Sequence, residues 1–443
     1  MDTNTLFGSA SIGRILWKIA PPVMLAQLIQ ALYNIVDSFF IGEYAETGLT
    51  ALSVIFPIQL LMIALATGTG VGINTVMAAR LGAGKRAEAE AYAGVGTVLG
   101  LTMWLVFAGV CWCILPAFAK MSTDSEAVIR ETIIYGRITC LCSLGLFLES
   151  IWTKVLQAYG DMKTPMIAQI AGAVTNIILD PILIFGLFGV PELGIAGAAA
   201  ATVTGQCVAA GIVGIKGFRK SPPLSGYPRQ IWEICRLGFP NMLMQSAYTF
   251  YILGLNLILA AFSDQAVTAL GLYYKWQTFF FIPLFAMQTC IVPVISYNYA
   301  AHQLDRCRKT MYTAIWFGIA FMSVGILCFE LFPEPLLRVF TEDPLVIEIG
   351  RTAFRIIGCS FIPIVTALIF PVFLQAVGEG AKSAMLTVIR TVICFVPLGY
   401  LFSRLGLHWF WMTFPVTEII TTAAGILLYK KFLQNPYRKE HIQ

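Results

Sequence analysis

The chain has 443 residues, of which 58% are hydrophobic and 12% are charged, with a formal net charge of +5 and a mean hydropathy of +0.78. A soluble domain carries about 25% charged residues. The composition therefore excludes a water-facing globular fold and predicts an integral membrane protein.

Apolar stretches of roughly 20 or more residues recur along the chain, and each is long enough for a helix to cross a hydrocarbon core of about 30 Å. The alternation of apolar and polar residues that marks membrane strands is missing from the sequence. We predict an all-α integral membrane fold with twelve transmembrane helices. The predicted spans are residues 15–41, 51–79, 89–116, 132–158, 165–188, 193–216, 233–261, 267–297, 309–332, 347–376, 383–403 and 409–431.

The first half of the sequence returns in the second half at a constant offset of 218 residues. Six spans in each copy mean that both copies start on the same side, which is the plan of two parallel repeats. We expect an N-terminal lobe at 1–216, an inter-lobe linker at 217–230 and a C-terminal lobe at 231–443. Matching pairs include Pro22 and Pro240, Arg137 and Arg355, and residues 156–161 and 374–379.

The distribution of Lys and Arg sets the expected orientation. With the N-terminus inside, the outer loops carry only Lys120, Arg130, Arg338 and Arg404, and the other loop cations lie on the inner side. This bias predicts a multi-pass protein of the cell (cytoplasmic) membrane with both termini in the cytoplasm. The net positive charge is explained by orientation, so we expect a lipid bilayer and no nucleic acid as partner.

Polar residues inside the first span share one helical face, because Gln30, Tyr33, Asn34 and Asp37 are three or four residues apart. An acid at this depth costs several kcal/mol and usually faces a bundle interior or a wet cavity. A structural salt bridge to Arg137 is the alternative interpretation of Asp37.

The fifth span places Asn176 and Asp180 on one face, directly before Pro181. Two carboxylates, an amide oxygen and a carbonyl freed by proline would suit a hard cation or a shared proton. At the 218-residue offset, Asp37, Asn176 and Asp180 fall opposite apolar residues and a cysteine: Leu255, Cys394 and Leu398. The sixth span adds Thr202 and Gln206 after a run of small residues at 194–201, for which close helix packing is the favoured role.

Several segments resemble those of the multidrug and toxic compound extrusion (MATE) transporters, in the order expected for that family. They are residues 20–22, 33–42, 81–85, 156–161, 176–181 and 297–301. The resemblance implies a twelve-helix secondary antiporter that exports organic cations and other amphipathic toxins, driven by inward movement of protons or Na+. It implies no enzymatic activity, no catalytic residue and no cofactor or metal beyond a possible sodium ion, and we expect a monomer.

Carried over residue by residue, the family's cation site falls on six residues of the first half: Tyr33, Asp37, Asn176, Asp180, Ala198 and Thr202. The sodium-coupled branch of the family has a further acid in the seventh span. Tyr248 stands at that place with Gln245 nearby, which favours the branch in which the N-terminal acids do the coupling.

The second half has charges of its own at membrane depth, namely Lys275, Arg390 and Glu418. A paired internal network is their favoured role over substrate binding. Aromatic, Met and Gln side chains could line a substrate cavity by stacking and cation–π attraction, although core filling explains any single one of them as well. The cavity candidates are Gln30, Asn34, Gln206, Gln245, Tyr248, Tyr251, Trp276, Met287 and Gln288.

Three other functional classes fit the sequence less well. A flippase for lipids or lipid-linked saccharides is the main alternative, but pyrophosphate would require a much more basic cavity. A membrane-embedded enzyme would need a nucleophile with a base or a metal cluster, and a channel would need a repeated filter. The sequence has neither pattern.

Overall fold

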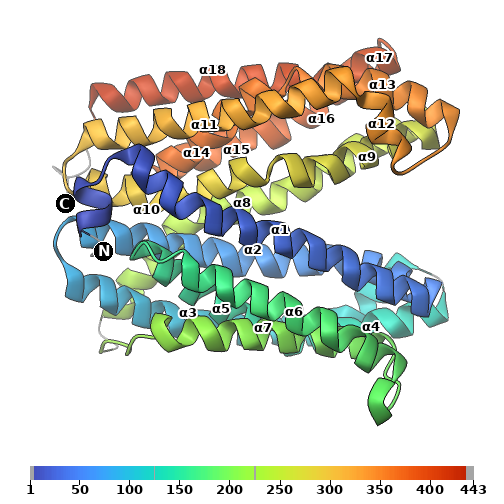
Figure 1. Ribbon diagram of the computed structural model, residues 1–443, viewed down its shortest axis with the longest axis horizontal. Coiled ribbons are helices and arrows are strands. Elements are labelled where there is room, and N and C mark those ends of the chain that lie inside the picture. The colour runs from blue at the N-terminus through green and yellow to red at the C-terminus, as the bar shows by residue number, and fades with distance from the viewer. Residues whose placement is uncertain (1–3, 124, 224–225, 436–443) are drawn as a thin grey trace. The chain divides into compact units, whose positions relative to one another are not determined.

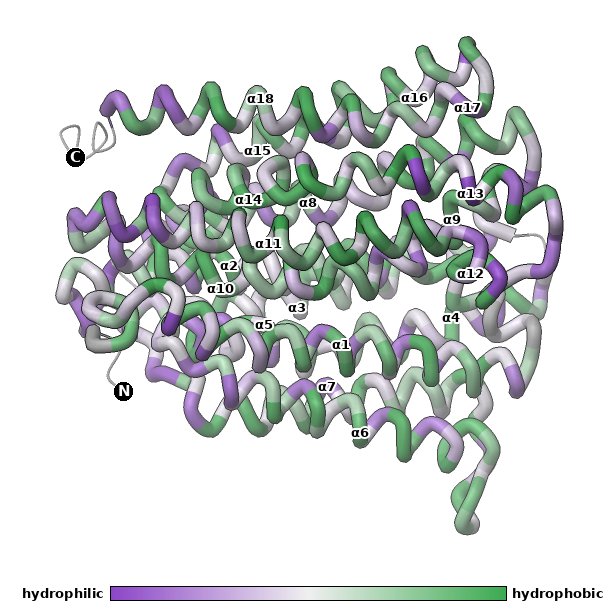
Figure 2. Tube along the Cα trace, turned by 45° about the horizontal axis from the view of Figure 1, so that its top comes forward, coloured by the Kyte–Doolittle hydropathy of each residue, from purple (hydrophilic) through white to green (hydrophobic). Residues whose placement is uncertain are grey.

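The computed structural model describes residues 4–123, 125–223 and 226–435, and the ends of both predicted lobes and part of the predicted linker fall outside these ranges. Within them the chain is built from helices, without strands, as the sequence predicts. Figure 1 shows the helices in chain order, and Figure 2 shows hydrophobic residues along their middles with hydrophilic residues gathered toward their ends. This distribution is what a lipid-facing bundle requires, because lipid cannot satisfy polar groups.

Two compact units divide the chain, Met1–Gln245 with Ser296–His302, and Ser246–Ile295 with Gln303–Gln443. The first unit contains the short η1 (Asn4–Ser9) and η2 (Leu187–Gly189), α1 (Ile12–Tyr44), α2 (Glu46–Gly82), α3 (Arg86–Ser122), α4 (Glu126–Leu141), α5 (Leu144–Ala158), α6 (Lys163–Phe185) and α7 (Ile195–Gly217). Helix α8 (Tyr227–Ala260) begins in the first unit and ends in the second. The lobe boundaries at 216 and 231 stay a prediction.

The second unit holds most of the remaining helices, and α10 ends within the first unit. These elements are α9 (Asp264–Phe280), α10 (Ile282–Ala300), α11 (Leu304–Leu331), α12 (Pro333–Arg338), α13 (Pro344–Gly358), α14 (Phe361–Ala376), α15 (Gly380–Val388), the π-helical η4 (Ile389–Phe395), α16 (Val396–Ser403), α17 (Leu407–Phe410) and α18 (Thr413–Gln434).

Nine helical spans in the described part of the chain are long and apolar enough to cross a membrane. Three further spans are bent pairs, α4 with α5, α9 with α10, and α13 with α14, with bends of 42°, 50° and 55°. Counting each pair once gives the twelve spans that the sequence predicts.

The repeated motif at 156–161 and 374–379 is a helix stop in both copies. Gly160 follows α5 and Gly378 follows α14, with φ of +83° and +81°. Only glycine adopts this left-handed conformation at little cost. In each copy the N–H of the next residue donates back into the last helical turn, at 3.0 and 2.8 Å. The sequence repeat is therefore also a repeat of local structure.

The core of the first unit gathers side chains from five helices. Ile41 of α1, Ile55 of α2, Leu115 of α3, Tyr135 of α4 and Ala198 of α7 belong to one buried apolar cluster. Each of these five residues is at most 2% exposed. The cluster fixes how the helices that carry the first-half polar residues pack together.

The start of α8 belongs to the first unit because it packs closely on α2. A Cβ atom on Gly238 would lie 2.3 Å from the carbonyl oxygen of Gly68, so only glycine permits the contact. Near the same end of α8, Arg80 Nη2 lies 3.3 Å from Glu233 Oε2. Backbone contact and ion pair together attach this segment to α2.

Candidate functional site

The site in the first unit depends on a close contact between α6 and α7. A Cβ atom on Gly205 would lie 2.6 Å from the carbonyl oxygen of Gly172, and one on Gly197 would lie 2.5 Å from the backbone of Leu183. These contacts are of the kind predicted for the small-residue run, because small residues let helix backbones approach in lipid. Figure 1 shows α6 and α7 side by side. Their approach brings polar residues of the two helices together.

A polar cluster lies where α1, α6 and α7 meet. Asn176 Nδ2 donates to Asp180 Oδ1 at 3.2 Å and to Thr202 Oγ1 at 3.4 Å. Asp37 of α1 is within electrostatic reach of Asp180. The structure thus joins four of the six residues of the implied cation site.

The cluster is rich in buried oxygens that have no donor. Asp37 is 8% exposed, Asn176 2% and Asp180 0%. Asp37 Oδ1, Asn176 Oδ1 and Asp180 Oδ2 each lack a hydrogen-bond partner. A buried acceptor without a donor costs about 1–3 kcal/mol, and more when charged. A proton or a hard cation such as Na+ would satisfy these oxygens.

The salt-bridge alternative for Asp37 does not appear in the structure. The guanidinium carbon of Arg137 lies 4.3 Å from the centre of the Trp112 ring, a cation–π arrangement. Over the residues that the structure describes, no ion pair within 4.0 Å includes Asp37. The carboxyl group is thus held without a cationic side chain beside it.

A cavity of about 90 Å³ opens next to this cluster. Five residues singled out in the sequence line it, with polar side chains from α1, α6 and α7: Gln30, Tyr33, Asn176, Thr202 and Gln206. Tyr33 is also within electrostatic reach of Asp37 and Asp180. The cavity therefore connects the cation site to a space that a ligand could enter.

Two further polar residues line the cavity and were missed from the sequence, Glu149 of α5 and Gln169 of α6. Glu149 accepts a hydrogen bond from Thr153 Oγ1 at 2.8 Å and is also hydrogen-bonded to Gln169. The signal was available, because Glu149 is an acid inside the predicted span 132–158. The same depth argument that selected Asp37 would have selected it.

The other predicted residues of the first half differ in their surroundings. Ala198 is fully buried in the apolar cluster, and its implied role, through a backbone oxygen, stays a prediction. Asn34 is exposed on α1 and does not line the cavity. Its spacing from Gln30 and Asp37 places it on the same broad face, but not at the angle that points into the bundle.

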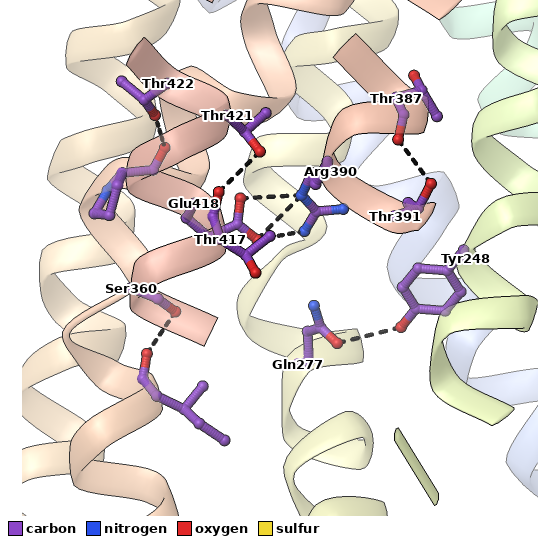
Figure 3. A network of polar contacts seen from close by, with 12 residues as sticks. Tyr248, Gln277, Ser360, Thr387, Arg390, Thr391, Thr417, Glu418, Thr421 and Thr422 are labelled. Atoms are coloured by element: carbon purple, nitrogen blue, oxygen red, sulfur yellow. Dashed lines mark hydrogen bonds and ion pairs between the residues drawn. The ribbon is translucent and has the colours of Figure 1, made fainter. Parts of the chain in front are cut away.

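The second unit has a buried ion pair instead of a cluster of acids. Arg390 of η4 donates through Nε and Nη2 to the Glu418 carboxylate of α18, with the shortest contact at 2.6 Å. Figure 3 shows Glu418 on one side of the guanidinium, and Tyr248 hydrogen-bonded to Gln277 on the other. Tyr251 stacks on Phe395 at 4.4 Å between ring centres. This network neutralises its own charge.

The remaining second-half candidates lie apart from this pair. The exposed Lys275 extends over the Phe340 ring, with Nζ 4.9 Å from its centre, so the predicted three-membered charge network contains only two of its members. Trp276 Nε1 donates to the carbonyl of Leu336 at 3.0 Å.

Three predicted cavity residues also lie away from the described cavity. Met287 is fully buried, and Gln288 donates to the carbonyl of Leu368 at 3.0 Å. Both therefore serve the helix packing of the second unit. Gln245 is exposed on α8.

At one end of the second unit, outside the spans, Glu334 accepts hydrogen bonds from Arg338 at 2.8 Å and from Arg351 at 2.7 Å. The hydrogen bond from Arg338, supported by the charges of both arginines, holds the pKa of Glu334 below its usual value. This cluster ties α12 to α13.

Comparison with known proteins gives consistent results over almost the whole chain. A family model described as MatE matches residues 22–182 and 240–401. The probable multidrug resistance protein NorM of Thermotoga maritima is 26% identical, over 97% of this chain and 94% of the relative. The FAD transporter of Shewanella oneidensis is 24% identical, over 96% of each chain. The solved structure of a MOP superfamily transporter from Pyrococcus furiosus shares the fold, with a TM-score of 0.90 at 21% identity over 98% of both chains.

Proposed function

This chain belongs to the MatE family of membrane transporters, and we propose that it is a secondary active antiporter that exports organic cations and other amphipathic toxic compounds in exchange for protons or Na+. The family membership bears out the resemblance found in the sequence. The proposal concerns the direction of coupling, the coupling ion and the transported substrate.

One observation carries the proposal: two buried acids of the first unit, Asp37 and Asp180, keep carboxylate oxygens without donors. An uncompensated carboxylate at membrane depth is expensive, so a fold that needed only stability would replace it. A residue that must alternately take up and release a cation needs carboxylate oxygens that no permanent donor occupies. The pair therefore fits a site that is loaded by a proton or by Na+.

The coupling cycle follows from this arrangement. When the acids are deprotonated, the cavity carries negative charge and attracts an organic cation from the cytoplasm. After the lobes switch access to the outside, a proton or Na+ neutralises the acids and disfavours retention of the cation. The acidic character of this site favours cations over the anionic flavin nucleotide for which the Shewanella relative is named.

Membrane placement completes the proposal. The scarcity of Lys and Arg in the predicted outer loops supports insertion in the cytoplasmic membrane with both termini inside. We take the transporting unit to be a single chain, because each lobe supplies six spans and the first lobe contains the whole acidic cluster.

Transport by purified protein in lipid vesicles tests the proposal. Ethidium movement is followed under an imposed proton gradient and then under an imposed Na+ gradient, with Asp37→Asn alongside. Transport driven by one gradient and lost in the variant is expected, and it would identify the coupling ion. Wild-type vesicles that move ethidium under neither gradient would refute the antiport proposal.

A further inference from the structure

Glu149 is a membrane-depth acid that the coupling pair does not explain. It lies in α5 and lines the cavity, whereas Asp37 and Asp180 do not line it. The first unit therefore has two separable acidic positions, one beside the cavity and one within it.

The immediate neighbours of the Glu149 carboxyl group are uncharged. Thr153 and Gln169 supply neutral hydrogen bonds. Across the described ranges Glu149 has no ion pair within 4.0 Å. The cation that acts on it electrostatically is Lys154, five residues along the same helix, whose Nζ donates to Gln157 Oε1 at 2.9 Å. A carboxyl group without a paired cation thus lines the cavity.

The cavity wall also offers acceptors that lack donors. Asn176 Oδ1 and Gln206 Oε1 have no hydrogen-bond partner, and Asn176 is 2% exposed. Tyr33 adds an aromatic ring to the same wall and is within electrostatic reach of Glu149. A carboxylate, the free amide oxygen of Gln206 and the ring of Tyr33 are a set that binds an organic ammonium or a similar cation.

The internal repeat argues against a purely structural role. At the 218-residue offset Ala367 stands where Glu149 stands, on the helix α14 that corresponds to α5. The second copy therefore builds this helix with a methyl group at the same place. Glu149 joins Asp37, Asn176 and Asp180 as a polar residue that only the first copy has.

We propose that Glu149 is the counter-ion that binds the positive charge of the transported organic cation, while Asp37 and Asp180 bind the coupling ion. The inference rests on the proposed function. A cavity of about 90 Å³ is smaller than the roughly 300–1,000 Å³ of a site that encloses a drug-sized molecule. The cavity therefore holds the charged end of the substrate, and the remainder extends through its opening.

Phenyltrimethylammonium is the test probe, because its charge lies at one end of the molecule, is permanent and does not titrate. Its dissociation constant and transport kinetics are measured for purified, reconstituted wild type and for Glu149→Gln, Glu149→Asp and Asp37→Asn. Glu90→Gln, which removes a half-buried acid of α3 that does not line the cavity, is the matched control. Thermal unfolding confirms that each variant is folded.

Glu149→Gln is expected to weaken binding about tenfold or more, because it removes the negative charge that attracts the cation. KM should rise while the maximal rate is retained, and Glu149→Asp should restore most of the affinity. Asp37→Asn should instead lower the maximal rate. A merely structural role of Glu149 would not change KM in the Glu149 variants and the maximal rate in Asp37→Asn.

The other outcomes separate the two proposals. Unchanged binding and KM in Glu149→Gln, or a lowered maximal rate with unchanged KM, would overturn the role of Glu149 and leave antiport standing. Wild type that binds the probe through Glu149 but moves it under neither gradient would overturn antiport alone. Wild type that neither binds nor moves the probe would overturn both.

Discussion

Replacing Gly205 by alanine tests whether the close contact of α6 and α7 builds the candidate site. The added Cβ would lie 2.6 Å from the carbonyl oxygen of Gly172 and 3.3 Å from the Cβ of Asn176. The first distance is shorter than real Cβ atoms show, and its partner is backbone that cannot rotate away. The two helices must therefore separate by several tenths of an ångström.

That separation acts on a contact that is already long. The hydrogen bond from Asn176 to Thr202 measures 3.4 Å, so a further few tenths of an ångström would break it. Overpacking of this kind costs about 1–3 kcal/mol. Alanine gains up to about 1 kcal/mol over glycine in a helix, so we expect a net destabilisation of up to about 2 kcal/mol.

Gly211 provides the control on the same helix, because a Cβ atom there would meet nothing within 4 Å. Gly211→Ala should unfold at the wild-type temperature or above it. Gly205→Ala should unfold several degrees lower and bind phenyltrimethylammonium more weakly. Equal unfolding temperatures and equal binding in the two variants would refute the argument that the glycine contact sets the site.

Three further predictions concern charged groups. Asp37→Asn and Asp180→Asn should each abolish drug resistance in cells at unchanged expression, and normal export by both would contradict the coupling role. Arg390→Met should destabilise the second unit by about 3–5 kcal/mol, because Glu418 is left buried without its partner, and adding Glu418→Gln should recover most of the loss in thermal unfolding. Glu334, whose pKa is lowered by its neighbouring arginines, contributes stability that is present at neutral pH and lost as the pH falls through the lowered pKa. Glu334→Gln should therefore flatten the acid side of the plot of unfolding temperature against pH, and an unchanged plot would show that the cluster contributes nothing.

The length of the apolar segments and the membrane depth of polar residues were enough to predict much of the architecture and several residues of the candidate site. Apolar length predicts the helical class and the twelve spans, and the membrane depth of Asp37 and Asp180 marks them as functional candidates. The bend between α9 and α10 was not foreseen, although Pro283 follows the break at Phe281 by two residues and its ring cannot continue the hydrogen bonds of the preceding turn.

Side-chain direction was the least predictable feature. Depth alone grouped Lys275 with Arg390 and Glu418, but a long exposed lysine can turn toward an aromatic ring near the span end. Gln288 was expected to line a cavity, and the structure shows that a backbone carbonyl takes its amide. Residues that share one helical face cover a wide arc. The helical period therefore does not separate a side chain that lines a cavity from one that packs against a neighbouring helix.

The pairing of Arg390 with Glu418 also bears on how the chain enters the membrane. Arg390 is synthesised 28 residues before its partner, so its helix would meet the lipid with an unpaired charge if it were inserted alone. An arginine at the centre of a helix raises the insertion free energy by about 2.5–3.5 kcal/mol. We expect the last two spans to leave the insertion machinery together as a hairpin, with the ion pair already formed between them.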